Sequence, residues 1–188
     1  LKLRKGNNEK HEYALQAGML GLNVAAEGPF AAGYKGSYLV NYRYSTLSLL
    51  DKVGVSVGGA TTNFQDLSFN LLLPAGRWGT VTFFGFGGLS SQKLVAEKDP
   101  AKWEEDFDRY GFRFLSNTGA TGITHTLPVG SRTTLKSALS YSITENGLQS
   151  EYTEDDSSLS DDYKDSYKTR KWNASTTLHH KINNHHAI

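Results

Sequence analysis

Residues Asp66–Ser90 read Asp66-Leu-Ser-Phe-Asn-Leu-Leu-Leu-Pro74-Ala-Gly-Arg-Trp78-Gly-Thr-Val-Thr-Phe-Phe-Gly-Phe-Gly-Gly-Leu-Ser90. The first half alternates polar residues with the apolar residues Leu67, Phe69, Leu71 and Leu73. A period of two predicts a β-strand with one face in an apolar medium. Pro74 cannot donate to a ladder of strand hydrogen bonds, and Gly76 permits the positive φ of a tight turn. The stretch therefore predicts a β-hairpin.

The same hairpin signal recurs along the chain, at Leu127–Arg132 and more loosely at Glu27–Phe30. Between the turns, alternating runs predict long strands. They are Glu12–Glu27 as one run, Ser37–Leu50, Tyr110–Leu127, Thr133–Thr144 and Tyr167–Lys181, with partial strands at Leu1–Arg4 and His186–Ile188. We therefore predict an all-β protein built as an antiparallel up-and-down meander.

The composition excludes several classes of protein. The 188 residues include no Cys and one Met, so there is neither a disulfide framework nor a thiolate metal site. A net charge of +1 gives no electrostatic footprint for nucleic acid. No stretch approaches the roughly 18 apolar residues of a spanning helix. The mean hydropathy of −0.47 still permits a membrane barrel, because its strands alternate lipid-facing and lumen-facing residues.

The connections between the expected strands alternate in length. Short turns fall near residues 29–36, 74–79, 128–132 and 182–185, and longer polar loops near 51–64, 92–109 and 145–165. In the loop 92–109, Asp99-Pro100 followed by acidic residues predicts a short helix. Outer-membrane barrels alternate short periplasmic turns with long outer loops. The loop lengths therefore favour a membrane barrel over a soluble sheet.

Candidate chemistry is sparse. His179-His180 and His185-His186 bracket a turn, but adjacent residues of a strand point to opposite faces, so exposed histidines are the simpler interpretation. Carboxylates at Glu104–Asp108 and Glu151–Asp165 are typical of solvated loops. No Ser/His/Asp constellation is present, and we predict no enzymatic activity, no cofactor and no metal site.

Several phrases resemble a known family. The stretches Gly21–Phe30 and Tyr38–Leu50 are similar to early barrel strands of TonB-dependent outer-membrane receptors of the Bacteroidetes type. Leu1–Asn8 resembles the segment that follows the plug domain of such receptors, and Gly122–Leu127 and Leu178–Asn183 resemble their downward strands. The resemblance covers nearly the whole chain but includes no catalytic or substrate motif.

The resemblance implies that residues 1–188 are a partial β-barrel domain, neither closed nor carrying the plug, from a transmembrane barrel of about 22 strands. It implies a place in the outer membrane of a Gram-negative cell. The implied activity is uptake of a large nutrient such as a glycan, peptide or siderophore. The implied partners are outer-membrane lipid, the TonB–ExbB–ExbD system acting through an N-terminal region outside this sequence, and a surface lipoprotein.

The alternation assigns side chains to the two faces of the barrel wall. We expect lumen-facing side chains at Asn41, Arg43, Asp66, Asn70, Lys136 and Ser140. We expect lipid-facing side chains at Tyr42, Tyr44, Leu67, Phe69, Leu71, Leu139 and Trp172. Aromatic residues in or beside the long loops either contact a ligand or pack the loops together: Trp103, Phe107, Tyr110, Tyr152 and Tyr163. The alternative is a soluble β-sandwich or jelly-roll module that binds carbohydrate, which predicts shorter strands in two packed sheets.

Overall fold

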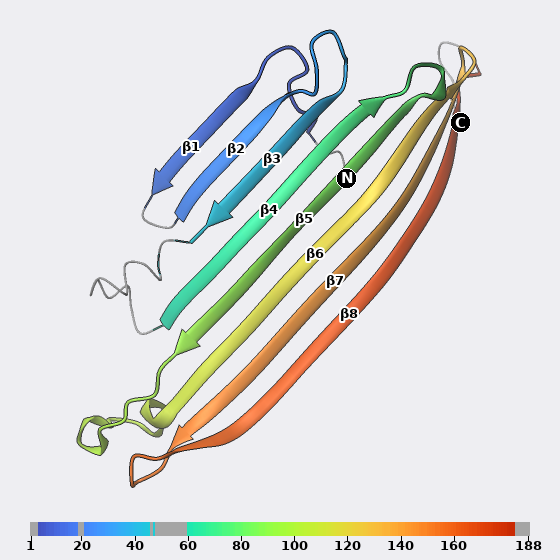
Figure 1. Cartoon of the computed structure of the whole chain (residues 1–188). Helices are drawn as coiled ribbons and strands as arrows, with labels where there is room; N and C mark the ends of the chain where they lie inside the picture. Colours follow the sequence, from blue (N-terminus) through green and yellow to red (C-terminus); the bar gives the residue numbers. More distant parts are fainter. Residues whose placement is uncertain (1–3, 19–20, 46, 48–59, 183–188) are drawn as a thin grey trace.

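The computed structural model describes residues 4–18, 21–45, 47 and 60–182, and these residues form one eight-stranded sheet (Figure 1). The strands follow chain order, and each pairs antiparallel with the next. Their bounds are β1 Glu12–Gly18, β2 Gly21–Pro29, β3 Ser37–Tyr44, β4 Ala60–Pro74, β5 Thr80–Leu94, β6 Tyr110–Val129, β7 Thr133–Thr153 and β8 Leu159–His180. The predicted all-β antiparallel meander is confirmed.

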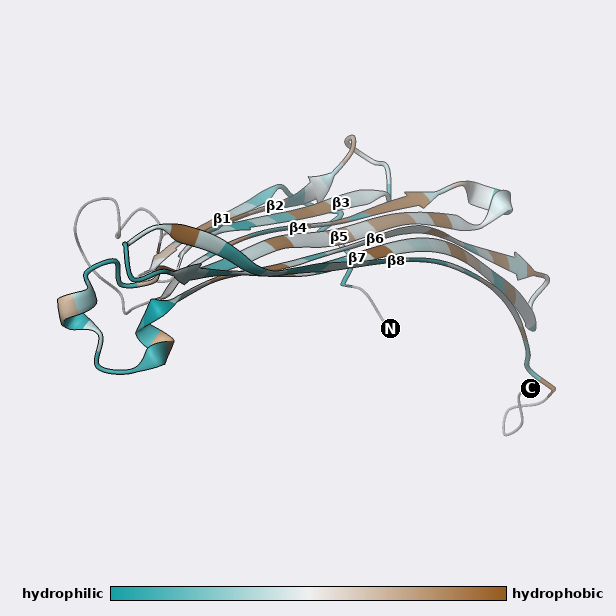
Figure 2. Cartoon of the chain, turned by 90° about the horizontal axis from the view of Figure 1, so that it is seen from below, coloured by the Kyte–Doolittle hydropathy of each residue, from teal (hydrophilic) through white to brown (hydrophobic). Residues whose placement is uncertain are grey.

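The sheet is a single arched layer, and no second sheet or helix covers either face in the described part of the chain (Figure 2). Ala96 is the one apolar residue there that is buried. A soluble domain buries a large apolar core, and this sheet buries almost none. Its apolar side chains therefore face outward into whatever medium surrounds the protein.

Glu12–Glu27 is not one long strand, and that prediction is wrong. β1 and β2 form a hairpin, with Gly18 paired to Gly21 and Glu12 paired to Glu27. Apolar residues occupy odd positions in β1 (Tyr13, Leu15 and Ala17) and even positions in β2 (Leu22, Val24 and Ala26), so the alternation changes phase at the reversal. This change of phase and the two glycines were the available signals for the turn.

The polar stretch Glu145–Asp165 is mostly strand rather than loop. β7 continues to Thr153 and β8 begins at Leu159, so only residues 154–158 connect them. Both faces of this extension carry polar side chains, and a search for apolar alternation cannot detect such a strand. The extension carries the β7–β8 connection to the far end of the long strands, beside the β5–β6 loop (Figure 1).

The predicted short helix near Asp99–Phe107 is replaced by two 3₁₀ helices, η2 at Pro100–Lys102 and η3 at Asp106–Arg109. The predicted cap is present, because the Asp99 Oδ1 atom accepts a hydrogen bond of 3.1 Å from the Ala101 N–H. A third 3₁₀ helix, η1 at Gly76–Trp78, forms the β4–β5 turn, where Gly76 has the predicted positive φ of 57°. No helix in the described residues is long or apolar enough to cross a membrane.

Some sequence predictions lie outside the described residues. These are the strand-end assignment of Leu1–Leu3, the connection Asp51–Gly59, His185-His186, and the partial strand His186–Ile188. Arg4, which is described, lies in no strand.

The β4–β5 turn depends on Gly79, which provides a test of the fold. Gly79 has φ 82° and ψ −145°, a conformation open almost only to glycine, and an added Cβ would stand 2.1 Å from the Thr126 carbonyl oxygen. We expect Gly79→Ala to lower the free energy of unfolding by roughly 3 kcal/mol or more. Urea unfolding followed by tryptophan fluorescence measures the change.

Gly130→Ala is the matched control for this substitution. Gly130 also has a positive φ, of 76°, but nothing lies within 4 Å of an added Cβ. We expect a cost of about 1 kcal/mol there. Equal costs at the two glycines would show that the contact with Thr126 does not restrict the turn.

Candidate functional site

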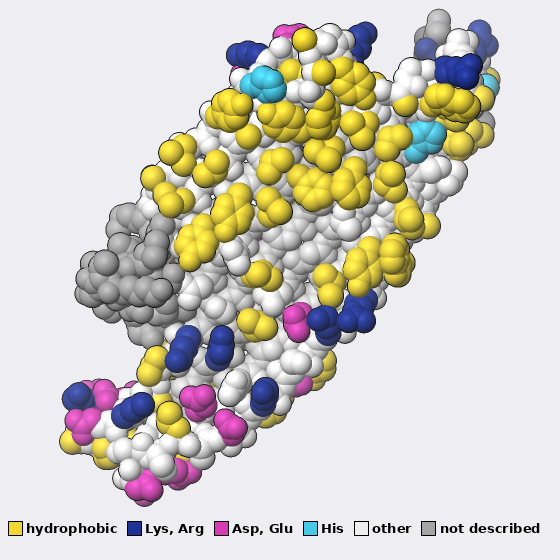
Figure 3. Space-filling model, viewed as in Figure 1, with side chains coloured by type: hydrophobic (Ala, Val, Ile, Leu, Met, Phe, Trp, Pro, Cys, Tyr) yellow, Lys and Arg dark blue, Asp and Glu magenta, His cyan; other side chains and the backbone are white. Residues whose placement is uncertain are grey.

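The convex face of the sheet carries a continuous apolar band, visible as the yellow area of Figure 3. Strand pairing aligns the alternating residues of neighbouring strands on this face, for example Tyr42 with Leu67 and Ile123 with Leu139. All seven residues expected to face lipid lie on it by register. Leu67 is 46% exposed, Leu139 45% and Trp172 68%, so the band is open rather than sealed in a core.

The band is narrow along the strands and has a polar border. It runs over Val81–Leu89 on β5 and Leu135–Ile143 on β7, a span that matches the roughly 9–11 residues needed to cross hydrocarbon. At its border on β7 and β8, the rings of Tyr141 and Trp172 lie 4.8 Å apart. Ile143 pairs with Arg170 across β7 and β8. The next pair on this face is Glu145 with Lys168, and these two side chains form an ion pair of 3.8 Å. Charged side chains therefore begin where the apolar residues end.

The concave face is the more polar one, and it also exposes Phe86 and Phe114. Each of the six residues expected to face a lumen lies on it by register: Asn41, Arg43, Asp66, Asn70, Lys136 and Ser140. Arg43 and Asp66 are paired directly across β3 and β4 and form an ion pair. The Lys136 side chain is exposed and forms no ion pair among the described residues, so this face includes both neutralised and free charge.

The segment before β1 crosses the concave face and is fixed there (Figure 2). The Arg4 guanidinium forms an ion pair of 2.6 Å with Glu27, and the Asn7 N–H donates to the same carboxylate at 2.8 Å. The Asn70 side-chain N–H donates to the Arg4 carbonyl oxygen at 2.6 Å. Asn70 is thus 5% exposed, and it binds the protein's own backbone rather than facing open solvent.

The long-loop end of the sheet holds a cluster around Arg109. Its guanidinium lies 4.5 Å from the centre of the Trp103 ring and 4.3 Å from that of Tyr152. The same side chain donates to the Thr153 carbonyl oxygen at 3.1 Å and to Asp155 at 2.8 Å. Tyr110 packs against Tyr152 with ring centres 5.0 Å apart. The cluster thereby joins the β5–β6 loop to the β7–β8 connection.

Four of the five predicted loop aromatics belong to this cluster: Trp103, Phe107, Tyr110 and Tyr152. Two of their rings are occupied by Arg109, an arrangement that packs the loops together. Phe107 is 57% exposed, so part of its ring stays open to a ligand. Tyr163 is separate, on β8, where its hydroxyl donates to Asp165 at 3.0 Å.

Sequence reasoning missed Arg109 and Phe112. Phe112 stacks on Phe107 and Tyr110, with ring centres 5.7 and 6.0 Å away. An arginine among acidic loop residues looks like ordinary surface charge, and only the fold brings it between two rings. In the described part of the chain, no three His, Cys, Asp or Glu side chains form a group that would hold a metal ion. There, His180 binds the Thr133 hydroxyl at 2.8 Å.

Asp108 makes the order of this loop dependent on pH. Its carboxylate accepts the Glu104 and Glu105 N–H groups at 2.8 and 3.0 Å, and these backbone hydrogen bonds lower the pKa of Asp108. A lowered pKa means that the stabilisation is present above the unfolded-state pKa and is lost as the pH falls through the folded-state value. We expect the two amides to lose protection from hydrogen exchange below about pH 4, relative to intrinsic exchange rates.

Asp108→Asn is the control for this pH effect. It keeps a side-chain oxygen but has no carboxylate to protonate. We expect the two amides of the variant to show weaker protection that does not change between pH 6 and pH 3. The same acid-induced loss in Asp108→Asn would assign it to another group.

Comparison with known protein families, with characterised proteins and with solved structures finds no match to this chain.

Proposed function

We propose that this chain is part of the wall of a transmembrane β-barrel in the outer membrane of a Gram-negative cell. The observation that supports it most strongly is the single-layer sheet with an open apolar band on its convex face. Lipid is the medium in which such a face is stable, whereas in water it would be an aggregation site. A β-sandwich would cover the face with a second sheet, and the described residues contain none.

The connections at the two ends of the sheet indicate which end faces the periplasm. The turns 75–79 and 130–132 lie at one end, beside the apolar band, and the Arg109 cluster and the strand extensions lie at the other (Figure 1). Short turns face the periplasm in outer-membrane barrels, and the longer connections face outside. The Arg109 cluster then stands on the cell exterior, where it meets the incoming nutrient first.

The barrel that this wall fits best is that of a TonB-dependent transporter of about 22 strands. Eight strands in chain order, without a crossover, form a regular arc of such a wall. In this arrangement the concave face lines the lumen, where Arg43, Asp66 and Lys136 meet the passing nutrient. Energy reaches the transporter from the TonB–ExbB–ExbD system, and a surface lipoprotein is the expected partner at the exterior end.

Fractionation of cells that produce the protein tests the membrane assignment. We expect the protein to remain in the outer-membrane fraction after an alkaline carbonate wash and to dissolve only with detergent. A protein that is soluble and monomeric without detergent would refute the barrel. For transport, growth on a large nutrient should require both this protein and a functional TonB.

A further inference from the structure

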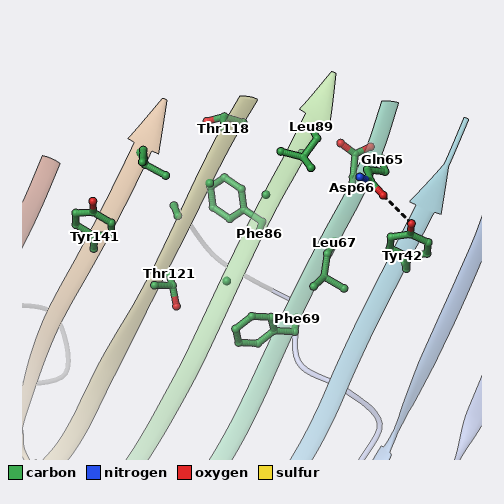
Figure 4. Close-up of a pocket in the computed structure, with 16 residues that line it drawn as sticks. Tyr42, Gln65, Asp66, Leu67, Phe69, Phe86, Leu89, Thr118, Thr121 and Tyr141 are labelled. Atoms are coloured by element: carbon green, nitrogen blue, oxygen red, sulfur yellow. Dashed lines mark hydrogen bonds between the residues drawn. The ribbon is translucent and has the colours of Figure 1, made fainter. Parts of the chain in front are cut away.

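The convex face has a hollow in the middle of its apolar band (Figure 4). The hollow has a volume of about 570 Å³, within the range of ligand sites. Its floor is the backbone of Gly87 and Gly119, where no side chain fills the surface, and its walls include Leu67, Phe69 and Ile143, with the Phe69 ring covering Gly85. Its shape and apolar lining suit a hydrocarbon chain.

A second hollow, of about 450 Å³, continues the first toward the long-loop end. The two share Gln65 and Leu89, so together they form one groove along the strands. The lining of the second hollow is more polar and includes Ser91 and Asn117. The groove therefore changes from apolar to polar toward the outer border of the band.

A row of unpaired cations lies at the polar end of this groove. Lys93 follows Ser91 on the same face of β5, and it is paired directly with Arg113 across β5 and β6. Arg113 pairs with Gln149 on β7, and Gln149 pairs with Lys164 on β8, so Lys164 belongs to the same row. All three cations are exposed, and none has an ion-pair partner among the described residues. Glu151 and Asp161, one row further out, form no ion pair with them.

Two like charges placed directly across a pair of strands destabilise a sheet unless an anion neutralises them. Among the described residues none supplies such an anion at Lys93 and Arg113. Figure 3 shows basic and acidic side chains together at the end of the convex face below the apolar band. The groove thus combines an apolar trough for a chain with a cationic end for a head group.

We infer that this groove binds an anionic lipid that carries phosphate. The acyl chain lies over the glycine floor, and the phosphate lies between Lys93 and Arg113. The inference rests on the proposed function, because it requires the convex face to stand in a membrane. Charge complementarity selects an anionic lipid: a neutral lipid would fill the trough equally well but would leave the two cations unneutralised.

Lipid titration of the complete protein tests this inference. The protein, purified in a non-ionic detergent, is titrated with fluorescent phosphatidic acid and with phosphatidylcholine that carries the same labelled chain. Each Lys or Arg near an anionic lipid contributes about 1 kcal/mol. We therefore expect Lys93→Gln/Arg113→Gln to weaken phosphatidic acid binding at least tenfold, without changing phosphatidylcholine binding.

Lys136→Gln/Lys171→Gln is the matched control, because it removes two positive charges from the concave face. We expect both lipids to bind this variant as they bind the wild type. A third variant, Gly119→Leu, fills the trough; its Cβ would stand 3.7 Å from the Ile143 Cγ2 atom and 3.9 Å from the Phe86 carbonyl oxygen, both ordinary van der Waals contacts. We expect it to weaken both lipids. If it lowers the yield of folded protein, Leu67→Ser tests the same trough.

The outcomes separate this inference from the proposed function. If the wild type incorporates into vesicles but Lys93→Gln/Arg113→Gln binds phosphatidic acid as tightly as Lys136→Gln/Lys171→Gln does, the lipid site is refuted and the barrel wall stands. A dimer in neutral detergent that Lys93→Gln/Arg113→Gln dissociates would assign the groove to a second copy, and this also refutes the lipid site. If the wild type does not enter membranes, both proposals fail together.

Discussion

Leu139→Arg is expected to destabilise the membrane-embedded protein by about 2–4 kcal/mol, the cost of an arginine on the lipid face of a barrel near mid-depth. Leu139 lies at the centre of the apolar band on β7, between Leu135 and Ile143, and is 45% exposed. In water, the same substitution of an exposed leucine would cost little. The large effect therefore arises from the medium rather than from packing.

Ser140→Arg is the matched control, because the next residue of a strand points to the opposite face. Ser140 lies on the concave face beside Gly122 and Asn173. We expect it to cost less than about 1 kcal/mol, since a lumen gives an arginine access to water. Urea unfolding from lipid vesicles measures both variants. Equal costs, or a larger cost at Ser140, would contradict the assignment of the two faces.

Ala138→Pro is expected to prevent insertion of the folded sheet. Ala138 lies on β7, an interior strand, and it pairs with Thr124 on β6 and with Ser175 on β8. Proline removes a ladder hydrogen bond, and the carbonyl left without a partner costs several kcal/mol where no water reaches it. The loss exceeds what most single substitutions cause.

Ala138→Thr keeps the N–H group and adds a side chain that suits strands. We expect this control to insert with nearly wild-type yield, because Ala138 is on the polar face. Comparing the amounts of the two variants in the outer-membrane fraction measures the effect. Normal insertion of Ala138→Pro would show that β7 does not cross a membrane as an interior strand.

Where one face of the sheet is apolar, sequence periodicity was sufficient to predict which face each side chain occupies. Tyr42, Leu67 and Leu139 are separated widely in the chain, yet simple alternation placed all three on one face, and the strand register agrees. The reason is physical: a slip of one residue would move every apolar side chain of a strand to the polar face. In the membrane wall that we propose, the apolar medium enforces both the pattern and the register.

The same reasoning fails where both faces are polar. Residues 145–153 and 159–165 belong to β7 and β8, but their side chains carry no apolar alternation, and a loop was predicted. Ladder hydrogen bonds with the neighbouring strand hold them, and these bonds leave no signature in the side chains. The hairpin at Gly18 and Gly21 was missed for a different reason, since alternation is present on both sides of it and only its phase changes, from odd positions to even ones.

The loop site was predicted in its residues but not in its organisation. The sequence places Trp103, Tyr110 and Tyr152 in or beside the long loops and leaves open whether they contact a ligand or pack the loops together. Their common centre, Arg109, depends on contacts between segments about 45 residues apart in the chain, such as its hydrogen bond to Thr153. Side-chain pairings at this separation follow from the register of β6 and β7, which no local pattern specifies.

We propose that the convex face contacts lipid and the concave face contacts water. Spin labels placed one at a time along residues 134–143 of β7, in the protein reconstituted into vesicles, distinguish this arrangement from a face that is sealed or exposed to water. We predict that labels at odd positions such as 137, 139 and 141 are relaxed by oxygen dissolved in the lipid. Labels at even positions such as 138, 140 and 142 should be relaxed by a water-soluble nickel complex. Labels at odd positions that are shielded from both reagents, or exposed to the nickel complex like their neighbours, would contradict a membrane-spanning wall.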